Sequence, residues 1–141
     1  MTFLVCWLAL TLNIYTEAGG EGTKGMELIA DTVVTRVHNK KYPNDICKVV
    51  LQPNQFNWTK RLKSKDFNGL LRYQEKVFAE RKFGDKERHA YFQAAQIAYK
   101  VMKPGYTPKY CYIHFYSGSD KPYWAKGKRA YKYGNHYFLR E

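Results

Sequence analysis

Acidic residues are scarce in this sequence. Its 141 residues include 12 Asp and Glu against 24 Lys and Arg, which gives a formal net charge of +12. So large a cationic excess indicates a polyanionic partner, which can be nucleic acid, an anionic membrane or an acidic polymer of a cell wall. Low-complexity and internally repeated segments are absent as well. This argues against a repeat array, and the length suits one domain with a core of its own.

Cysteine is also rare, with three residues at Cys6, Cys47 and Cys111. An odd number of distant cysteines is typical of a protein from a reducing cytosol, so we expect reduced thiols in the core. One disulfide with one free thiol is the alternative. A zinc site that adds His114 and His136 lacks a second paired motif, and Cys111 and His114 would point to opposite faces of a strand. We therefore expect no metal and no cofactor.

A hydrophobic run long enough to cross a membrane is missing too. The apolar segment 3–14 is short for a span, and it lacks the Lys or Arg that should precede the core of a signal peptide. Its larger residues recur at helical spacing, at Leu4, Leu8, Leu12 and Tyr15. We therefore expect a first core helix of the mature protein and no export signal.

Four further helices are expected along the chain. The apolar stripe of residues 26–37 predicts a second helix with Thr23 as its cap, and a short helix follows over 46–50, capped by Asn44 or Asp45. Residues from about Asp66 to Arg81 are expected to be helical. A long helix capped by Asp85 should end before Pro104 and Gly105.

The character of the sequence changes to β after Pro108. The aromatic and β-branched segment 110–116 predicts a strand, and residues 136–139 predict its partner. Gly118, Pro122, Trp124 and Gly127 lie in the loop between them. The expected fold is therefore α+β, mainly helical with a small antiparallel hairpin near the C-terminus.

Glu17 is the residue with the clearest chemical meaning. It ends the apolar first helix, which breaks at once into Gly19 and Gly20. Burial and the negative end of the helix dipole both disfavour the ionised carboxylate, so we expect the pKa of Glu17 to be raised. A glutamate that keeps its proton near neutral pH suits general acid catalysis, which makes an enzyme the first hypothesis.

The segment Glu17-Ala18-Gly19-Gly20-Glu21 resembles the Glu-Ala-Arg-Gly-Glu signature of SleB-type cell wall hydrolases, the spore cortex-lytic enzymes and their phage relatives. Further segments resemble motifs of this family in the same order, at 34–37, 42–50, 55–58, 114–115, 122–124 and 134–138. Two positions depart from the family pattern. Gly19 stands where the signature has arginine, and Tyr116 stands where a second histidine is expected.

The resemblance implies a lysozyme-like fold and a single catalytic domain over 1–141, with a family-like core at 4–59 and 106–141 and a helical insertion at about 60–105. It further implies a lytic transglycosylase that cleaves the bond between N-acetylmuramic acid and N-acetylglucosamine and leaves 1,6-anhydro ends. Glu17 would act as acid and then as base. Glu21 is the second candidate, with support of the loop or a charge at a helix start as its alternative role.

Seven further residues are expected to bind substrate, and the many aromatic rings of the chain suit stacking on sugars. For two of them a structural role is the alternative: Trp58 as a core residue and His136 as a structural residue of a turn. His114 and Tyr116 should point to the same face of their strand. The candidates are Gln55, Trp58, His114, Tyr116, Trp124, Asn135 and His136.

The setting implied by the resemblance is that of a bacteriophage endolysin. We expect a monomer that is made in the host cytoplasm, is released through a holin and acts on peptidoglycan within an anionic envelope, with no nucleic acid as partner. A hydrolytic muramidase that uses Glu17 with Asp66 or Asp120 as second carboxylate is one alternative. A basic, tyrosine-rich nucleic-acid-binding protein is the alternative from another class.

Overall fold

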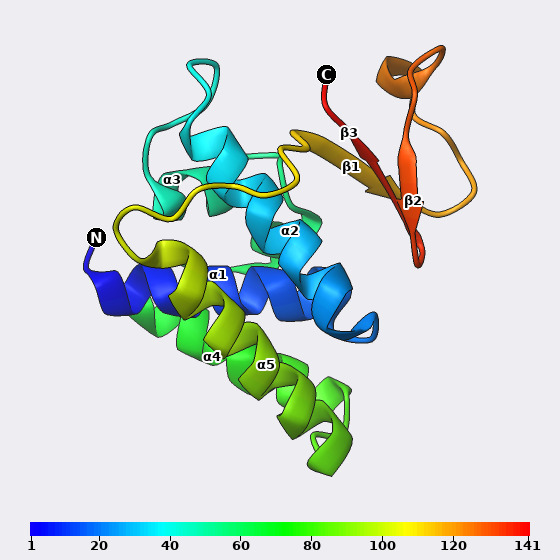
Figure 1. Ribbon diagram of the computed structural model, residues 1–141. Helices are drawn as coiled ribbons and strands as arrows, with labels where there is room; N and C mark the ends of the chain where they lie inside the picture. The colour runs from blue at the N-terminus through cyan, green and yellow to red at the C-terminus, as the bar shows by residue number, and fades with distance from the viewer.

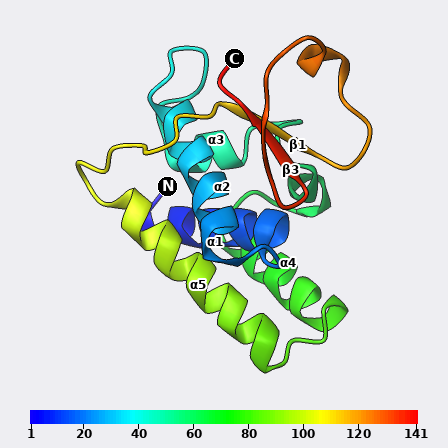
Figure 2. The ribbon, with the colours of Figure 1, turned by 45° about the vertical axis from the view of Figure 1, so that its right-hand side comes forward.

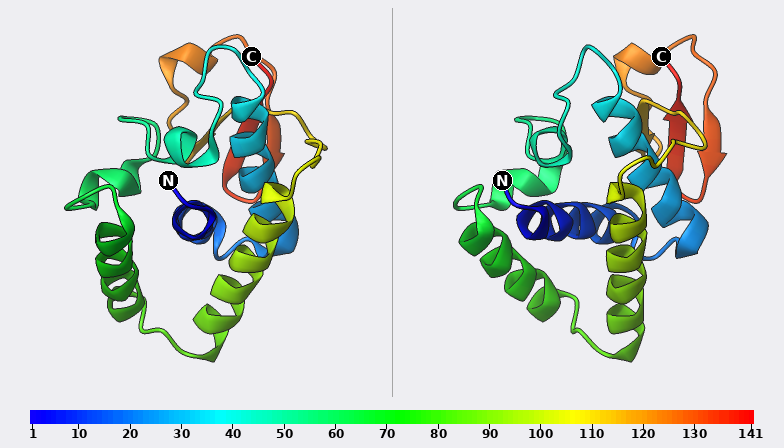
Figure 3. Two further views of the ribbon diagram at one scale, coloured as in Figure 1. Left: turned by 90° about the vertical axis from the view of Figure 1, so that its left-hand side faces the viewer. Right: turned by 60° about the vertical axis from the view of Figure 1, so that its left-hand side comes forward.

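Helix α1 (Phe3–Ala18) runs through the middle of the helical part of the molecule. The computed structural model describes residues 1–141 (Figure 1). Figure 3 (left) views α1 end-on, with the other helices arranged around it. The second half of α1 is buried on almost every side, which confirms the predicted core helix. None of the helices combines the length and the apolar character that crossing a bilayer requires.

Helices α2 (Gly22–Val37) and α3 (Ile46–Val50) cover one side of α1. The predicted apolar stripe of α2 is confirmed, because its Met, Ile and Val side chains lie in the core. The predicted cap is wrong, since α2 starts after Glu21 rather than at Thr23. Asp45 does cap α3, where its carboxylate accepts a hydrogen bond from the Lys48 N–H at 2.9 Å.

Helices α4 (Phe67–Glu80) and α5 (Asp85–Met102) form the lower part of the molecule in Figure 1. Their bounds are close to the predicted ones, although the cap of α5 is Gly84 and Asp85 is its first residue. Side chains of both helices belong to the same hydrophobic cluster as α1 and α2. The region 60–105 therefore completes the core, and a short 3-10 helix (Asn57–Arg61) leads into it.

The sheet has three antiparallel strands, β1 (His114–Ser117), β2 (Tyr131–Tyr133) and β3 (His136–Leu139), in the order β1-β3-β2. Phe138 is the register partner of both Phe115 and Tyr131. The α+β class is confirmed, and so is the predicted pairing of residues 136–139 with the strand in segment 110–116, which is β1. Strand β2 is additional. Figure 2 shows the sheet set beside α2, apart from α4 and α5.

The first predicted strand begins later than expected because Asp31 holds the segment before it. The buried Asp31 carboxylate accepts the backbone N–H groups of Lys109, Tyr110 and Cys111 at 2.6, 3.2 and 3.1 Å, and also the hydroxyl of Tyr106 at 3.3 Å. Cys111 has a φ of 60°, which no strand residue adopts. Asp31 therefore determines where the chain turns from α5 towards β1.

Changing Asp31 to Asn is expected to lower the free energy of unfolding by about 2 kcal/mol, because an amide cannot accept hydrogen bonds from so many donors as an ionised carboxylate. Denaturant unfolding measures the loss. Asp45→Asn is the matched control, since asparagine caps a helix as well as aspartate does. Equal stability of the Asp31 and Asp45 variants would contradict this role for Asp31.

The cysteines contradict the expectation of reduced thiols. Cys6 in α1 and Cys47 in α3 form a disulfide, and Cys111 is free and exposed. The packing of α3 on α1 brings the two Cα atoms to 4.9 Å, which is within the range of a disulfide. The pair is separated by 41 residues in the sequence, so it could not be recognised without the fold.

Candidate active site

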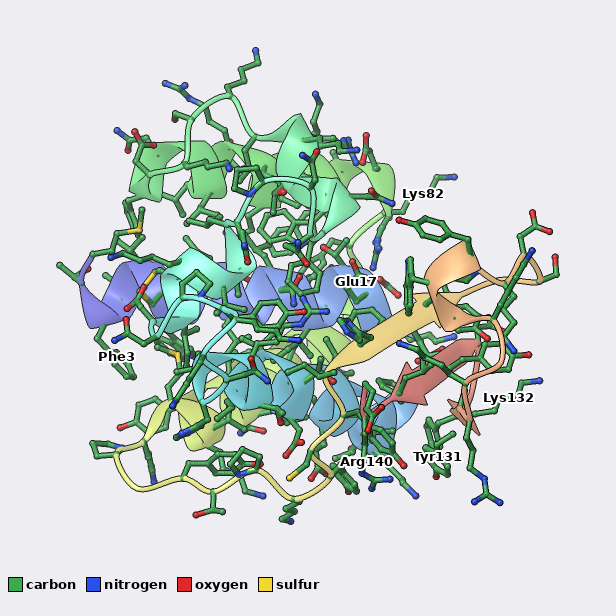
Figure 4. The ribbon with its side chains drawn as sticks, turned by 90° about the horizontal axis from the view of Figure 1, so that it is seen from above. Phe3, Glu17, Lys82, Tyr131, Lys132 and Arg140 are labelled. Atoms are coloured by element: carbon green, nitrogen blue, oxygen red, sulfur yellow. A yellow bond between two sulfur atoms is a disulfide. The ribbon has the colours of Figure 1, made fainter.

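Glu17 lies where two hollows of the surface meet. The first, which we call the His136 hollow, has a volume of about 640 Å³ and is lined by residues 16–21, Arg81, Ser117, Gly118, Asn135 and His136. The second, the Trp124 hollow, has about 360 Å³ and is lined by Glu17, Arg36, residues 55–57 and 115–117, Asp120, Pro122 and Trp124. Glu17 and Ser117 line both. Figure 4 shows Glu17 at the end of α1 that faces β1.

The surroundings of Glu17 favour its protonated form. Burial raises the pKa of the Glu17 carboxyl, while the positive charges of His136 and Arg36 oppose that rise. The predicted direction of the pKa shift is therefore confirmed. A carboxyl group with a raised pKa beside cationic groups is able to give up a proton and then to remain as a stabilised carboxylate.

Glu21 holds the turn between β2 and β3. Its carboxylate accepts the backbone N–H of Asn135 at 2.9 Å and the Nδ1–H of His136 at 2.7 Å. Gly134 has a φ of +58°, and a Cβ there would lie 2.8 Å from the Glu21 carboxylate. The glycine is therefore needed for this close approach. Both oxygens of Glu21 are thus occupied, which fits support of the loop better than proton transfer to a ligand.

An aromatic group forms the wall of the Trp124 hollow. The rings of His114 and Tyr116 lie 5.4 and 5.9 Å from the ring of Trp124, and Tyr137 stacks on Tyr116 at 4.9 Å. His114 and Tyr116 therefore share one face of β1, as predicted. Tyr116 and Trp124 line the hollow, whereas His114 contacts Trp124 but lines neither hollow, which corrects its predicted place in the cleft.

Arg36 is a residue of the site that the sequence reasoning missed. It is 5% exposed, its Nε–H donates to the carbonyl of Ile113 at 2.9 Å, and its guanidinium lies over the rings of Tyr42 and Phe56. Its Nη1 has no hydrogen-bond partner. The signal in the sequence was an arginine inside the apolar stripe of residues 33–37. A charge at such a position has to be buried, which is rare without a function.

The structure brings most of the predicted site residues together, with two corrections, His114 and Trp58. Trp58 is 3% exposed, packs on Tyr73 and donates its indole N–H to Asn13 at 2.8 Å, so it belongs to the core. Its size and hydrogen-bond partner suit a buried position, and it does not line the cleft. The predicted residues that line the two hollows are Glu17, Glu21, Gln55, Tyr116, Trp124, Asn135 and His136.

The two candidates for a second carboxylate differ in whether they line a hollow beside Glu17. Asp66 caps α4, where it accepts the N–H of Gly69 at 2.8 Å, and it does not line either hollow. Asp120 is exposed on the loop after β1 and lines the Trp124 hollow together with Glu17. Asp120 therefore remains a candidate partner of Glu17, whereas Asp66 does not.

Comparison with known proteins identifies relatives of this chain. Its fold is similar to the catalytic domain of the Bacillus cereus SleB protein, with a TM-score of 0.61 and 16% sequence identity over 99% of this chain and 92% of that one. A comparison with curated protein sequences finds no match. The sequence profile of the Cell Wall Hydrolase family matches residues 20–139, and Glu17 lies just before the matched residues. Because this match covers most of the sequence, the chain belongs to the cell wall hydrolase family.

Proposed function

We propose that this glycan-cleaving cell wall hydrolase acts on peptidoglycan as a lytic transglycosylase, at the bond between N-acetylmuramic acid and N-acetylglucosamine. The observation that carries the proposal is the position of Glu17, a carboxyl group with a raised pKa at the junction of two hollows. A glycan strand that passes through both hollows places one sugar on each side of Glu17. Trp124 and Tyr116 then offer rings for stacking on one of these sugars.

The reaction needs a single carboxyl group that changes role. Protonated Glu17 donates its proton to the glycosidic oxygen as the bond from C1 of the muramoyl sugar breaks, and the leaving sugar keeps that proton as a hydroxyl. The carboxylate of Glu17 then takes the proton from the 6-hydroxyl of the muramoyl sugar while that oxygen attacks C1. The product is a 1,6-anhydro ring, Glu17 is protonated again, and no water is consumed.

The cations beside Glu17 suit the second half of this reaction. Arg36 and His136 lower the pKa of the Glu17 carboxyl relative to burial alone, so they stabilise the carboxylate that forms after the first proton transfer. The Glu21 carboxylate fixes the orientation of His136 through Nδ1. Arg36 and His136 thereby act on the reaction through the charge of Glu17.

Mass spectrometry of digested, purified peptidoglycan tests the proposal. A transglycosylase releases muropeptides with anhydro ends, which are lighter by one water than the products of hydrolysis. Products with reducing ends would contradict the transglycosylase reaction and would favour a muramidase. Failure to release any glycan fragment would contradict glycan cleavage itself.

Asp120 is the observation that favours the muramidase alternative, because it provides the second carboxylate that most hydrolytic glycosidases require. Under the transglycosylase proposal, Asp120→Asn should keep its rate of cleavage within about threefold of the parent, since no step uses Asp120. A loss of roughly 10²-fold, the usual size of a missing general base, would instead assign Asp120 to a hydrolytic mechanism. The rate of release of soluble muropeptides measures the effect.

We also propose a role in host cell lysis, as expected for a bacteriophage endolysin. The net charge of +12 suits an enzyme that works within an anionic bacterial envelope. Expression in a bacterial cytoplasm should lead to lysis when a holin is produced at the same time, and growth should continue without it. Lysis that does not depend on the holin would contradict this route of release.

A further inference from the structure

A third hollow, with strongly cationic walls, lies on α4 and on the segment that precedes it. It has a volume of about 160 Å³ and shares no residue with the hollows beside Glu17. Its lining residues are Arg61, Lys63, Gly69, Arg72, Tyr73 and Lys76. We propose that this cationic hollow binds a phosphodiester group of an anionic cell wall polymer. The choice of a wall polymer rests on the proposed function.

The positive charges around the hollow are largely unneutralised. Arg61 is paired with Glu80 at 2.7 Å, but Lys63, Arg72 and Lys76 have no carboxylate within 4.0 Å. Arg72 and Lys76 are four residues apart on α4, a spacing at which like charges destabilise a helix. The charge of Asp66 attracts Arg72 but is not in salt-bridge contact with it. A bound anion would reduce the remaining repulsion and so stabilise the arrangement.

The backbone is built to bring these cations together. A Cβ at Gly69 would lie 1.8 Å from the carbonyl oxygen of Ser64, so only glycine allows the segment 61–65 to approach α4 this closely. Asp66 anchors the same junction through the N–H of Gly69 and the hydroxyl of Ser64. The positions of Arg61 and Lys63 relative to α4 are therefore determined by the fold rather than by chance exposure.

One of the cations is also held in place by its neighbours. The Arg61 guanidinium lies 5.4 Å from the centre of the Tyr73 ring and donates to Glu80 at 2.7 Å. Tyr73 is 4% exposed and lines the hollow. A guanidinium that is already ordered loses little entropy when it donates to an oxyanion, which favours binding.

The composition of the hollow indicates which polyanion it takes. Several Lys and Arg donors around a small space suit the oxygens of a single phosphoryl group. Single-stranded nucleic acid also needs exposed rings on which its bases stack, and the one ring here is buried. A phosphodiester polymer without bases, such as poly(glycerol phosphate), fits the cations and does not require stacking.

The test compares two pairs of substitutions that remove the same charge. Arg72→Gln with Lys76→Gln should weaken binding of poly(glycerol phosphate), measured by isothermal titration calorimetry, by at least about tenfold, because two charge-assisted hydrogen bonds are lost. Lys86→Gln with Lys100→Gln removes two exposed charges of α5 and should change the affinity less than about twofold.

The same variants separate this inference from the proposed function. The Arg72/Lys76 variant should cleave purified peptidoglycan that carries no phosphate polymer at the parental rate, and it should lose activity on walls that retain the polymer. Equal weakening by both pairs of substitutions would overturn the site, because it would show a general effect of charge. Preferential binding of single-stranded DNA, lost in the Arg72/Lys76 variant alone, would overturn the choice of ligand. If the parent does not cleave purified peptidoglycan, the proposed function fails whatever the polymer does.

Discussion

Glu17→Gln should cleave purified peptidoglycan roughly 10³-fold more slowly than the parent protein, because glutamine can neither donate the proton to the glycosidic oxygen nor take it back. Muropeptide release, followed over hours, measures the residual rate. In the parent, cleavage should also slow as the pH rises through the raised pKa of Glu17, since the protonated form is the one that starts the reaction.

The same substitution should stabilise the fold at neutral pH. The pKa of Glu17 in the folded protein lies above its ordinary value of 4.5. At a pH between these two pKa values, the folded state therefore binds more protons than the unfolded state. Stability contributed by Glu17 is therefore lost as the pH rises through the folded-state pKa. Glu17→Gln should have a higher melting temperature than the parent at pH 7, and the difference should vanish below about pH 4.

Glu21→Gln is the matched control for Glu17, since it makes the same chemical change a few residues away. We expect a smaller loss of activity, because both oxygens of Glu21 accept hydrogen bonds from Asn135 and His136 and the proposed reaction assigns it no proton transfer. An active Glu17 variant together with an inactive Glu21 variant would reverse the two assignments. Circular dichroism of both variants shows whether either loss results from unfolding.

Removal of the disulfide should cause the largest loss of stability. Its two cysteines are separated by 41 residues, and opening a loop of this length is expected to lower the free energy of unfolding by about 4 kcal/mol. For a chain of this size the melting temperature should fall by about 10 to 15 °C. Replacing both Cys6 and Cys47 with alanine, or adding a reductant to the parent, should give similar shifts by calorimetry.

Cys111→Ser provides the control for the effects of thiol chemistry. Cys111 is exposed and unpaired, so its replacement should leave the melting temperature unchanged with or without reductant. A parent protein that melts at the same temperature under oxidising and reducing conditions would contradict a stabilising disulfide. The link also bears on the active site, because Cys6 lies in the helix that carries Glu17.

Features that depend on neighbouring residues were predictable from the sequence. The apolar periodicity of residues 26–37 predicted α2, and the break at Gly19 and Gly20 placed Glu17 at the end of a buried helix. Local chemistry also predicted a cap of α3 at Asn44 or Asp45, and the cap is Asp45.

Features that depend on distant residues were not predictable in the same way. The start of β1 after Cys111 follows from Asp31, which lies in α2 and is distant in the sequence. The Glu21 carboxylate accepts hydrogen bonds from a turn that is far away in the sequence. The indole N–H of Trp58 finds its partner within the core, at Asn13. The side chain of each of these residues suits both a structural role and a role in the site, and only the tertiary packing decides which of the two it has.

The hydrogen bonds from Asn135 and His136 to Glu21 span 114 and 115 residues. Synthesis on the ribosome makes Glu17 long before β1 and the turn before β3, which complete its two hollows. The cleft therefore cannot form until these segments have left the ribosome, and closing so long a loop is slow. A chain terminated before residue 135 would contain Glu17 and the residues that line the Trp124 hollow, but it would lack Asn135 and His136, which line the other hollow and bind Glu21. The site is therefore complete only after β3 has been made.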